Sequence, residues 1–103
     1  MKIYTKKDSI VKRNIHDVAY LINVSDNYLD EKCRLYELNQ IGSVIWDLLD
    51  DDYPDQIEGI ANKIKNMIID DIPINVIIND VTSFLELMKS EGFLEEVENG
   101  RTE

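Results

Sequence analysis

Few side chains in this 103-residue chain have the types and spacing that catalysis or metal binding requires. His16 is the only histidine and Cys33 the only cysteine, too few for a four-ligand zinc site and at no zinc spacing. A Ser-His-Asp nucleophile would need an activated serine, and no G-x-S-x-G turn occurs. We therefore expect a solvated turn histidine, a small strand cysteine, and a protein that is not an enzyme and holds no metal or cofactor.

Two further patterns that are typical of ligand sites fail on spacing. The glycines are scattered, at positions 42, 59, 92 and 100, and cannot form one loop that cradles a phosphate. The acidic run at 50–52 suggests calcium, but a calcium loop counted from Asp50 needs glycine at its sixth position and glutamate at its twelfth. Asp55 and Ala61 stand there instead. We expect this run to be a solvated loop.

The net charge of −10 is distributed unevenly along the chain. Residues 1–34 contain seven Lys and Arg against five Asp and Glu, a balance of +2, whereas residues 35–103 contain four against sixteen, a balance of −12. Because phosphate backbones are bound by clustered cations, nucleic acid is a poor partner for the C-terminal two-thirds. No apolar run approaches the roughly 20 residues of a membrane helix, and no apolar stretch follows the N-terminal lysines as in a signal peptide. With a single cysteine, these features predict a cytoplasmic protein without a membrane partner.

The N-terminal part of the chain predicts an antiparallel meander. Residues 1–9 are polar and are expected to be loosely held. We predict strands at 10–13, 18–24 and 32–38, joined by turns at 14–17 and 25–31. The second strand is apolar on both faces, which favours a central position in the sheet.

The C-terminal part predicts three helices. The apolar period changes at Asn39, whose side chain can accept hydrogen bonds from the first turn of a helix at 40–49. Pro54 fits the first turn of a second helix, and a third runs over 75–90 until Gly92 stops it, with the chain fraying from Glu95. The apolar stripe of the second helix is Ile57, Ile60, Ala61, Ile64, Met67 and Ile68, and that of the third is Ile77, Ile78, Val81, Phe84, Leu85 and Met88.

Three strands followed by three helices predict one α+β domain of the winged helix-turn-helix-like kind over residues 1–103, with flexible ends at 1–9 and 98–103. Winged helices often bind DNA, so a DNA-binding or transcription-associated module is the alternative function. However, the helix that would enter the groove carries one cation, Lys89, against Asp80 and Glu86. The composition therefore disfavours DNA and leaves protein or peptide as the partner.

If the strand order follows the chain, strand 32–38 lies at a sheet edge with unpaired N–H and C=O groups. An extended peptide can add to such an edge, with specificity from side-chain pockets against the neighbouring third helix. Arg34 and Glu37 would either guard the edge or pair with the incoming strand. Leu35 and Tyr36 point to opposite faces, so at least one of them fills the core.

Three segments carry a family resemblance. Residues 38–50 read LNQIGSVIWDLLD, residues 57–64 read IEGIANKI, and residues 80–88 read DVTSFLELM before Gly-Phe-Leu at 92–94. The first resembles the LN-x-x-G/A-x-x-I-W-x-L-L-D segment of PqqD-like peptide-binding domains, also called precursor peptide recognition elements of ribosomally made, modified peptides (RiPPs). The other two resemble the later helices of that family, and the resemblance extends over residues 10–97. Asp51 stands where the family usually has glycine, which alters a turn.

The resemblance implies a winged-helix-like fold and a non-catalytic function: binding the leader region of a precursor peptide and presenting it to a maturation enzyme. It places the leader as a strand along Cys33, Arg34, Leu35, Tyr36 and Glu37, against Ile77, Asp80, Val81 and Phe84 of the third helix. The enzyme would be a separate chain, for example a leader peptidase of the lasso type or a radical-SAM enzyme. A structural subunit that docks on such an enzyme without touching peptide is a third hypothesis.

Overall fold

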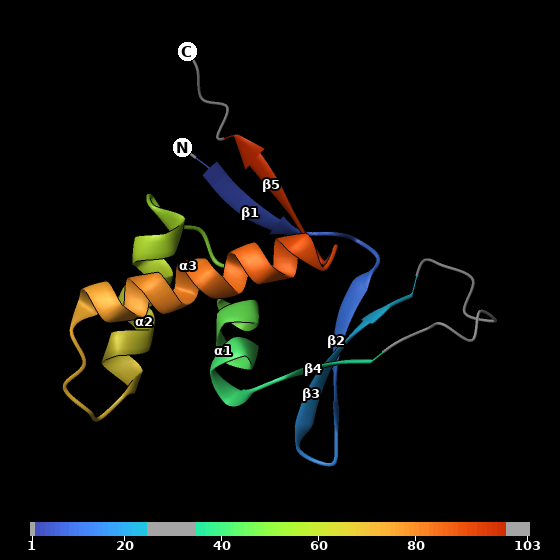
Figure 1. Cartoon of the computed structure of the whole chain (residues 1–103), viewed down its shortest axis with the longest axis horizontal. Coiled ribbons are helices and arrows are strands. Elements are labelled where there is room, and N and C mark those ends of the chain that lie inside the picture. The colour runs from blue at the N-terminus through green and yellow to red at the C-terminus, as the bar shows by residue number, and fades with distance from the viewer. Residues whose placement is uncertain (1, 25–34, 99–103) are drawn as a thin grey trace.

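Two small antiparallel sheets and three helices make up the part of the chain that the computed structural model describes, residues 2–24 and 35–98. In chain order the elements are β1 (Lys2–Lys6), β2 (Ile10–Ile15), β3 (Val18–Asn23), β4 (Tyr36–Leu38), α1 (Gln40–Leu48), α2 (Gln56–Met67), α3 (Ile74–Ser90) and β5 (Leu94–Glu98). Figure 1 shows α3 running between the β1–β5 ribbon at one end and the α2–α3 connection at the other. The α+β class is as predicted, and the second sheet is an addition to it.

The three-stranded sheet has the predicted order β2-β3-β4, with β3 at its centre. The turn between β2 and β3 is shorter than expected and consists of His16 and Asp17, which have positive φ values of 52° and 68°. Two such residues make the tight turn whose twist suits a two-residue hairpin, so β2 continues to Ile15 instead of ending at Arg13. Of the third predicted strand, 36–38 is present as β4, Leu35 precedes it without strand pairing, and 32–34 lies outside the described residues.

The ends of the described chain depart most from expectation. Residues 1–9 were expected to be loosely held and the chain to fray from Glu95, but β1 pairs with β5 in antiparallel register from Lys2↔Glu98 to Lys6↔Leu94. The buried Tyr4 side chain anchors this ribbon, and its hydroxyl donates to the Glu86 carboxylate on α3. Burial and this hydrogen bond raise the pKa of Tyr4 far above its ordinary value. Because β1 is mostly polar, its sequence alone does not predict a strand that is held by these long-range contacts.

The helix boundaries follow their capping residues. Asn39 caps α1 as predicted, its Oδ1 accepting from the Gly42 N–H at 2.7 Å. The prediction for Pro54 is wrong, since α2 begins at Gln56 with Asp55 as the N-cap, accepting from the Glu58 N–H at 3.1 Å. Gly92 ends the α3 region with a φ of +88°, as predicted.

The core lies where α3 meets the other layers. Its buried residues Ile77, Val81, Leu85 and Met88 belong to one hydrophobic cluster with Ile60 and Ile64 of α2, Trp46 of α1 and Leu21 of β3. Each such fully buried side chain contributes roughly 1.5–3 kcal/mol of hydrophobic free energy. None of the helices within the described ranges has the length and apolar character needed to cross a bilayer.

Candidate peptide-binding site

The register of the β2–β3 hairpin determines which backbone N–H and C=O groups of β4 point away from the sheet. Ile15 and Val18 flank the two-residue turn, so they exchange both ladder hydrogen bonds, and alternate pairs along β2 and β3 do the same. The bond from the Val24 N–H to the Ser9 carbonyl, 2.7 Å, fits this alternation. The backbone groups of Ala19 and Leu21 on β3 therefore point the other way, toward β4.

The backbone groups of Ala19 and Leu21 pair with those of Leu38 and Tyr36, the residues of β4 that are in register with them. Consequently the N–H and C=O of Tyr36 and Leu38 are used in the ladder, whereas those of Glu37 point outward. In the described part of the chain the sheet order ends at β4, with no strand on its outer side. Glu37 thus presents a donor and an acceptor at the edge.

Two contacts relate the second half of α3 to β4, one through Phe93 just after the helix and one through α1, which follows β4. The Tyr36 ring meets the Phe93 ring edge to face, with centroids 5.2 Å apart at 73°. Phe84 packs so closely on the start of α1 that a Cβ at Gly42 would lie 2.8 Å from its Cε1. We call this region, with Leu35 to Leu38 on one side and Phe84, Leu87 and Phe93 on the other, the β4–α3 strip.

The strip has an exposed apolar character. Leu35 is 52% exposed and Leu87 is 46% exposed, while Tyr36, Phe84 and Phe93 are half-buried around them. Leu87 follows Phe84 by three residues and therefore shares its flank of the helix, beside the buried stripe. Sequence analysis did not select Leu87 or assign Phe93 to the site; the three-residue spacing from Phe84 was the available signal.

The structure distributes the predicted helix residues over two environments. Ile77 and Val81 are buried in the core beneath the strip. Asp80 is exposed, one turn before Phe84 on the same flank, and Phe84 is half-buried. On the strand side, Leu35 and Glu37 are exposed and Tyr36 is half-buried, whereas Cys33 and Arg34 lie outside the described residues.

The electrostatics of α3 are acidic. Lys89 is its one cation, and its amine lies 2.6 Å from Glu96 and 3.8 Å from Glu86. The hydrogen bond to Glu96 is the main cause of the raised pKa of Lys89. A phosphate backbone would therefore find no unpaired cation on this helix. Over the described ranges, no group of three or more His, Cys, Asp or Glu side chains is placed to hold a metal ion.

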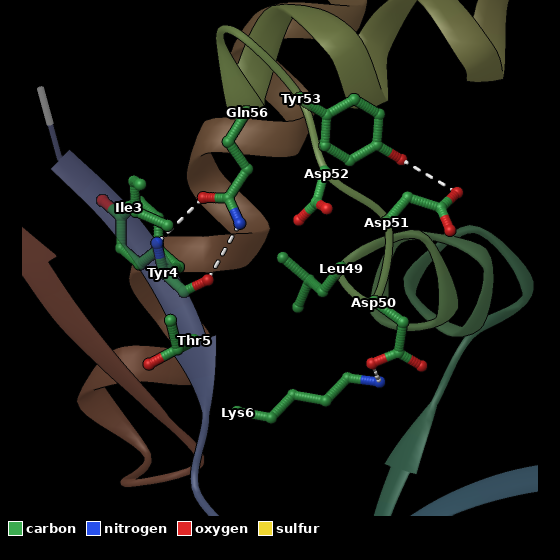
Figure 2. A pocket seen from close by; sticks show the side chains of 10 residues that line it. All are labelled: Ile3, Tyr4, Thr5, Lys6, Leu49, Asp50, Asp51, Asp52, Tyr53 and Gln56. Atoms are coloured by element: carbon green, nitrogen blue, oxygen red, sulfur yellow. Dashed lines mark hydrogen bonds and ion pairs between the residues drawn. The ribbon is translucent and has the colours of Figure 1, made fainter. Parts of the chain in front are cut away.

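The edge of β1 offers a contrast, because a side chain occupies it. Figure 2 shows the Gln56 carboxamide against the Tyr4 backbone: the Tyr4 N–H donates to Oε1 at 2.8 Å, and Nε2 donates to the Tyr4 carbonyl at 2.9 Å. A hollow of about 220 Å³ adjoins this contact, with Asp50 to Asp52 on its far wall. Lys6 reaches across it to Asp50 at 3.0 Å. This edge is already paired at its centre.

Comparison with known proteins assigns the family. Residues 29–94 match the sequence model of the family described as coenzyme PQQ synthesis protein D (PqqD). The chain belongs to the PqqD family. Among solved structures it is similar to the one titled "TbiB1 in Complex with the TbiA(beta) Leader Peptide", with a TM-score of 0.67 and 20% identity over 96% of this chain and 99% of that chain. At that identity the likeness establishes a shared fold, and no curated protein matches this PqqD-family chain.

Proposed function

We propose that this chain binds the leader region of a ribosomally made precursor peptide, which adds as a strand to the outer edge of β4, and presents it to a separate maturation enzyme. The observation that carries the proposal is the outward N–H and C=O of Glu37 beside an exposed apolar strip. Membership of the PqqD family supports it, as does the fold shared with TbiB1, whose structure is titled as a leader-peptide complex.

The energetics indicate what the peptide must contribute. Two main-chain hydrogen bonds to Glu37 are worth roughly 1–3 kcal/mol together, whereas micromolar binding needs about 8 kcal/mol. Apolar burial along the strip must supply most of the rest, at roughly 1.5–3 kcal/mol per buried side chain. We therefore expect the leader to present apolar residues at alternate positions, facing Phe84 and Leu87 on α3.

The proposed site keeps the strand residues of the sequence analysis and extends the helix side. On the strand, Cys33, Arg34, Leu35, Tyr36 and Glu37 would lie along the peptide. On the helix, Asp80 and Phe84 would contact it together with Leu87, and Phe93 would support Tyr36 from below. Ile77 and Val81 would act from the core by holding α3 in place.

We further propose a winged helix-turn-helix-like architecture for the single domain, with the β2–β3 hairpin as the wing, and a non-enzymatic, cytoplasmic role. Family membership supports the non-enzymatic role. The DNA-binding alternative gains no support, because the cation of α3 is engaged by Glu86 and Glu96.

Calorimetric titration of the chain with the precursor peptide encoded beside its own gene tests the proposal. We expect micromolar or tighter binding to the leader region, and none to a leader of scrambled order. Absence of binding at about tens of micromolar, well above the expected constant, would contradict the proposed function.

A further inference from the structure

Three apolar side chains at the connection between α2 and α3 and in the adjoining helix turns are exposed to solvent. Ile69 is 100% exposed, Met67 is 57% exposed and Val76 is 44% exposed. These three come from ten consecutive residues that span the α2–α3 connection, and this connection lies at one end of α3 in Figure 1. We call them, with the adjacent Asp70 and Asp71, the α2–α3 tip.

The tip is held in a defined conformation. Ile68, Ile72 and Ile74 pack against the core from the same segment. The Lys65 amine donates to the Ile72 carbonyl at 2.7 Å, and the Ile72 N–H donates to the Asp70 carbonyl at 3.1 Å. Because its neighbours are anchored inward, Ile69 is held outward, so little conformational entropy would be lost when a partner covers it.

An exposed apolar cluster on a rigid loop is typical of an interaction surface. Ile69 contributes nothing to the core, since it is fully exposed. Apolar side chains that enter a partner's pocket, surrounded by polar groups, are the usual source of binding energy at an interface. The tip has this arrangement, with carboxylates beside the apolar side chains.

The charge of the tip indicates the chemistry of the partner. Asp70 and Asp71 are both exposed, and Lys65 lies 3.9 Å from Asp71 and is shared with the Ile72 carbonyl. A second copy placed tip to tip would oppose these carboxylates, in a chain whose net charge is already −10. An anionic membrane surface would repel them as well. An apolar recess bordered by Lys or Arg is the complementary surface.

The position of the tip leaves the peptide strip free. Ile69 precedes the N-terminal end of α3 and Val76 lies in its first turn, whereas Phe93 follows its C-terminal end. A 17-residue helix is about 25 Å long. A partner centred on Ile69 therefore leaves the end of the strip around Leu87 and Phe93 free for a peptide on β4, whereas Asp80, one turn after Val76, lies nearest to that partner. This is the geometry required of a chain that holds a peptide while another protein acts on it.

We propose that the α2–α3 tip docks the maturation enzyme, through an apolar recess on that enzyme bordered by basic residues. The inference rests on the proposed function, because it takes the enzyme to be a separate chain. Ile69 is the central contact, Met67 and Val76 flank it, and Asp70 and Asp71 supply the charge complementarity.

Association of the purified chain with the maturation enzyme encoded beside it, measured by interferometry without precursor peptide, tests the docking. We expect Ile69→Ser to weaken association at least tenfold and Val76→Ser about threefold, with unchanged thermal unfolding. Val97→Ser is the matched control, since Val97 on β5 is also 44% exposed, and should change association less than twofold. Replacing Asp70 and Asp71 together by lysine should weaken it at least tenfold at low salt.

The outcomes separate this inference from the leader-binding proposal. No association of the unsubstituted chain with the enzyme, unchanged association of Ile69→Ser, or tighter association of the lysine variant would each overturn the docking. So would sedimentation of the chain alone as a dimer that Ile69→Ser dissociates, or binding of the chain to phosphatidylcholine vesicles that Ile69→Ser abolishes. Tip-dependent association with the enzyme in a chain that binds no precursor would support the docking and overturn the leader-binding proposal instead.

Discussion

Two strands of this protein, β1 and β4, each turn a backbone N–H and C=O away from their sheet, but the two edges differ in what lies against these groups. At the centre of β1, the outward N–H and C=O of Tyr4 are both bound by the carboxamide of Gln56. At β4, the outward groups of Glu37 lie at the end of the sheet order in the described part of the chain. One edge is joined to α2 by a side chain, and the other ends the three-stranded sheet within the described residues.

The difference lies in the neighbouring side chains. A glutamine amide carries one acceptor and two donors, so it can replace a paired strand at one residue. The remaining outer strands, β2 and β5, carry charged residues such as Lys12, Arg13, Glu95 and Glu98, which discourage pairing with another chain. On its helix side, the β4–α3 strip carries the exposed Leu87 and the half-buried Phe84 instead of charged residues.

Removing the cover from the β1 edge should produce the largest effect on stability. We expect Gln56→Ala to lower the free energy of unfolding by about 2–4 kcal/mol, because two buried backbone groups of Tyr4 lose their partners. Urea unfolding measures this, with Asn62→Ala on the exposed side of α2 as the control, expected within about 0.7 kcal/mol. An unchanged midpoint for Gln56→Ala would show that water replaces the amide at little cost.

Blocking the β4 edge should affect binding and leave the fold intact. Glu37→Pro removes an outward N–H that the sheet does not use, so we expect precursor affinity to fall roughly 10- to 100-fold. Glu37→Gln keeps the N–H and should bind within about threefold of the original, since an exposed charge contributes less than about 1 kcal/mol. Calorimetry gives both values, and equal affinities for the two variants would exclude strand addition at this residue.

The anchoring of β1 should give the protein a sensitivity to alkaline pH. The raised pKa of Tyr4 means that the fold stabilises the neutral phenol. This stabilisation is complete below the unfolded pKa of 10.0 and is lost as pH rises above it toward the folded value. Tyr4→Phe should cost about 1 kcal/mol at neutral pH and make stability fall less steeply above pH 10, by up to about 1.4 kcal/mol per pH unit. Parallel slopes for the two proteins would contradict this.

A substitution in the turn of the β2–β3 hairpin, whose register orients the backbone of Glu37, should have the smallest effect on stability. Asp17 has a φ of 68°, a conformation that glycine adopts without strain. We expect Asp17→Gly to stabilise the protein by about 0.5–1 kcal/mol, raising the melting temperature by a few degrees, with peptide affinity unchanged. A change in peptide affinity would show that the turn affects the edge beyond setting its register.

Local patterns allowed much of the fold to be predicted. The period change at Asn39, the stripe of α3 and the stop at Gly92 depend on neighbouring residues, and all three are present. The prediction for Pro54 fails because Asp55, one residue later, is the N-cap, its side chain accepting from the Glu58 N–H. Within the candidate site, sequence reasoning did not separate the buried Ile77 and Val81 from the exposed Asp80.

By itself, the sequence determined the three helices, the order of the three-stranded meander and the acidic character of the chain, because these follow from residue spacing and composition. Tertiary structure alone decided that a polar N-terminus becomes a strand, since Tyr4 meets Gln56 and Glu86 from 52 and 82 residues away. It also decided which backbone groups of β4 face outward, because that depends on a turn twenty residues earlier and on the alternation of a ladder across three strands. Contacts between distant residues have no local signature, so they become visible only when the chain is folded.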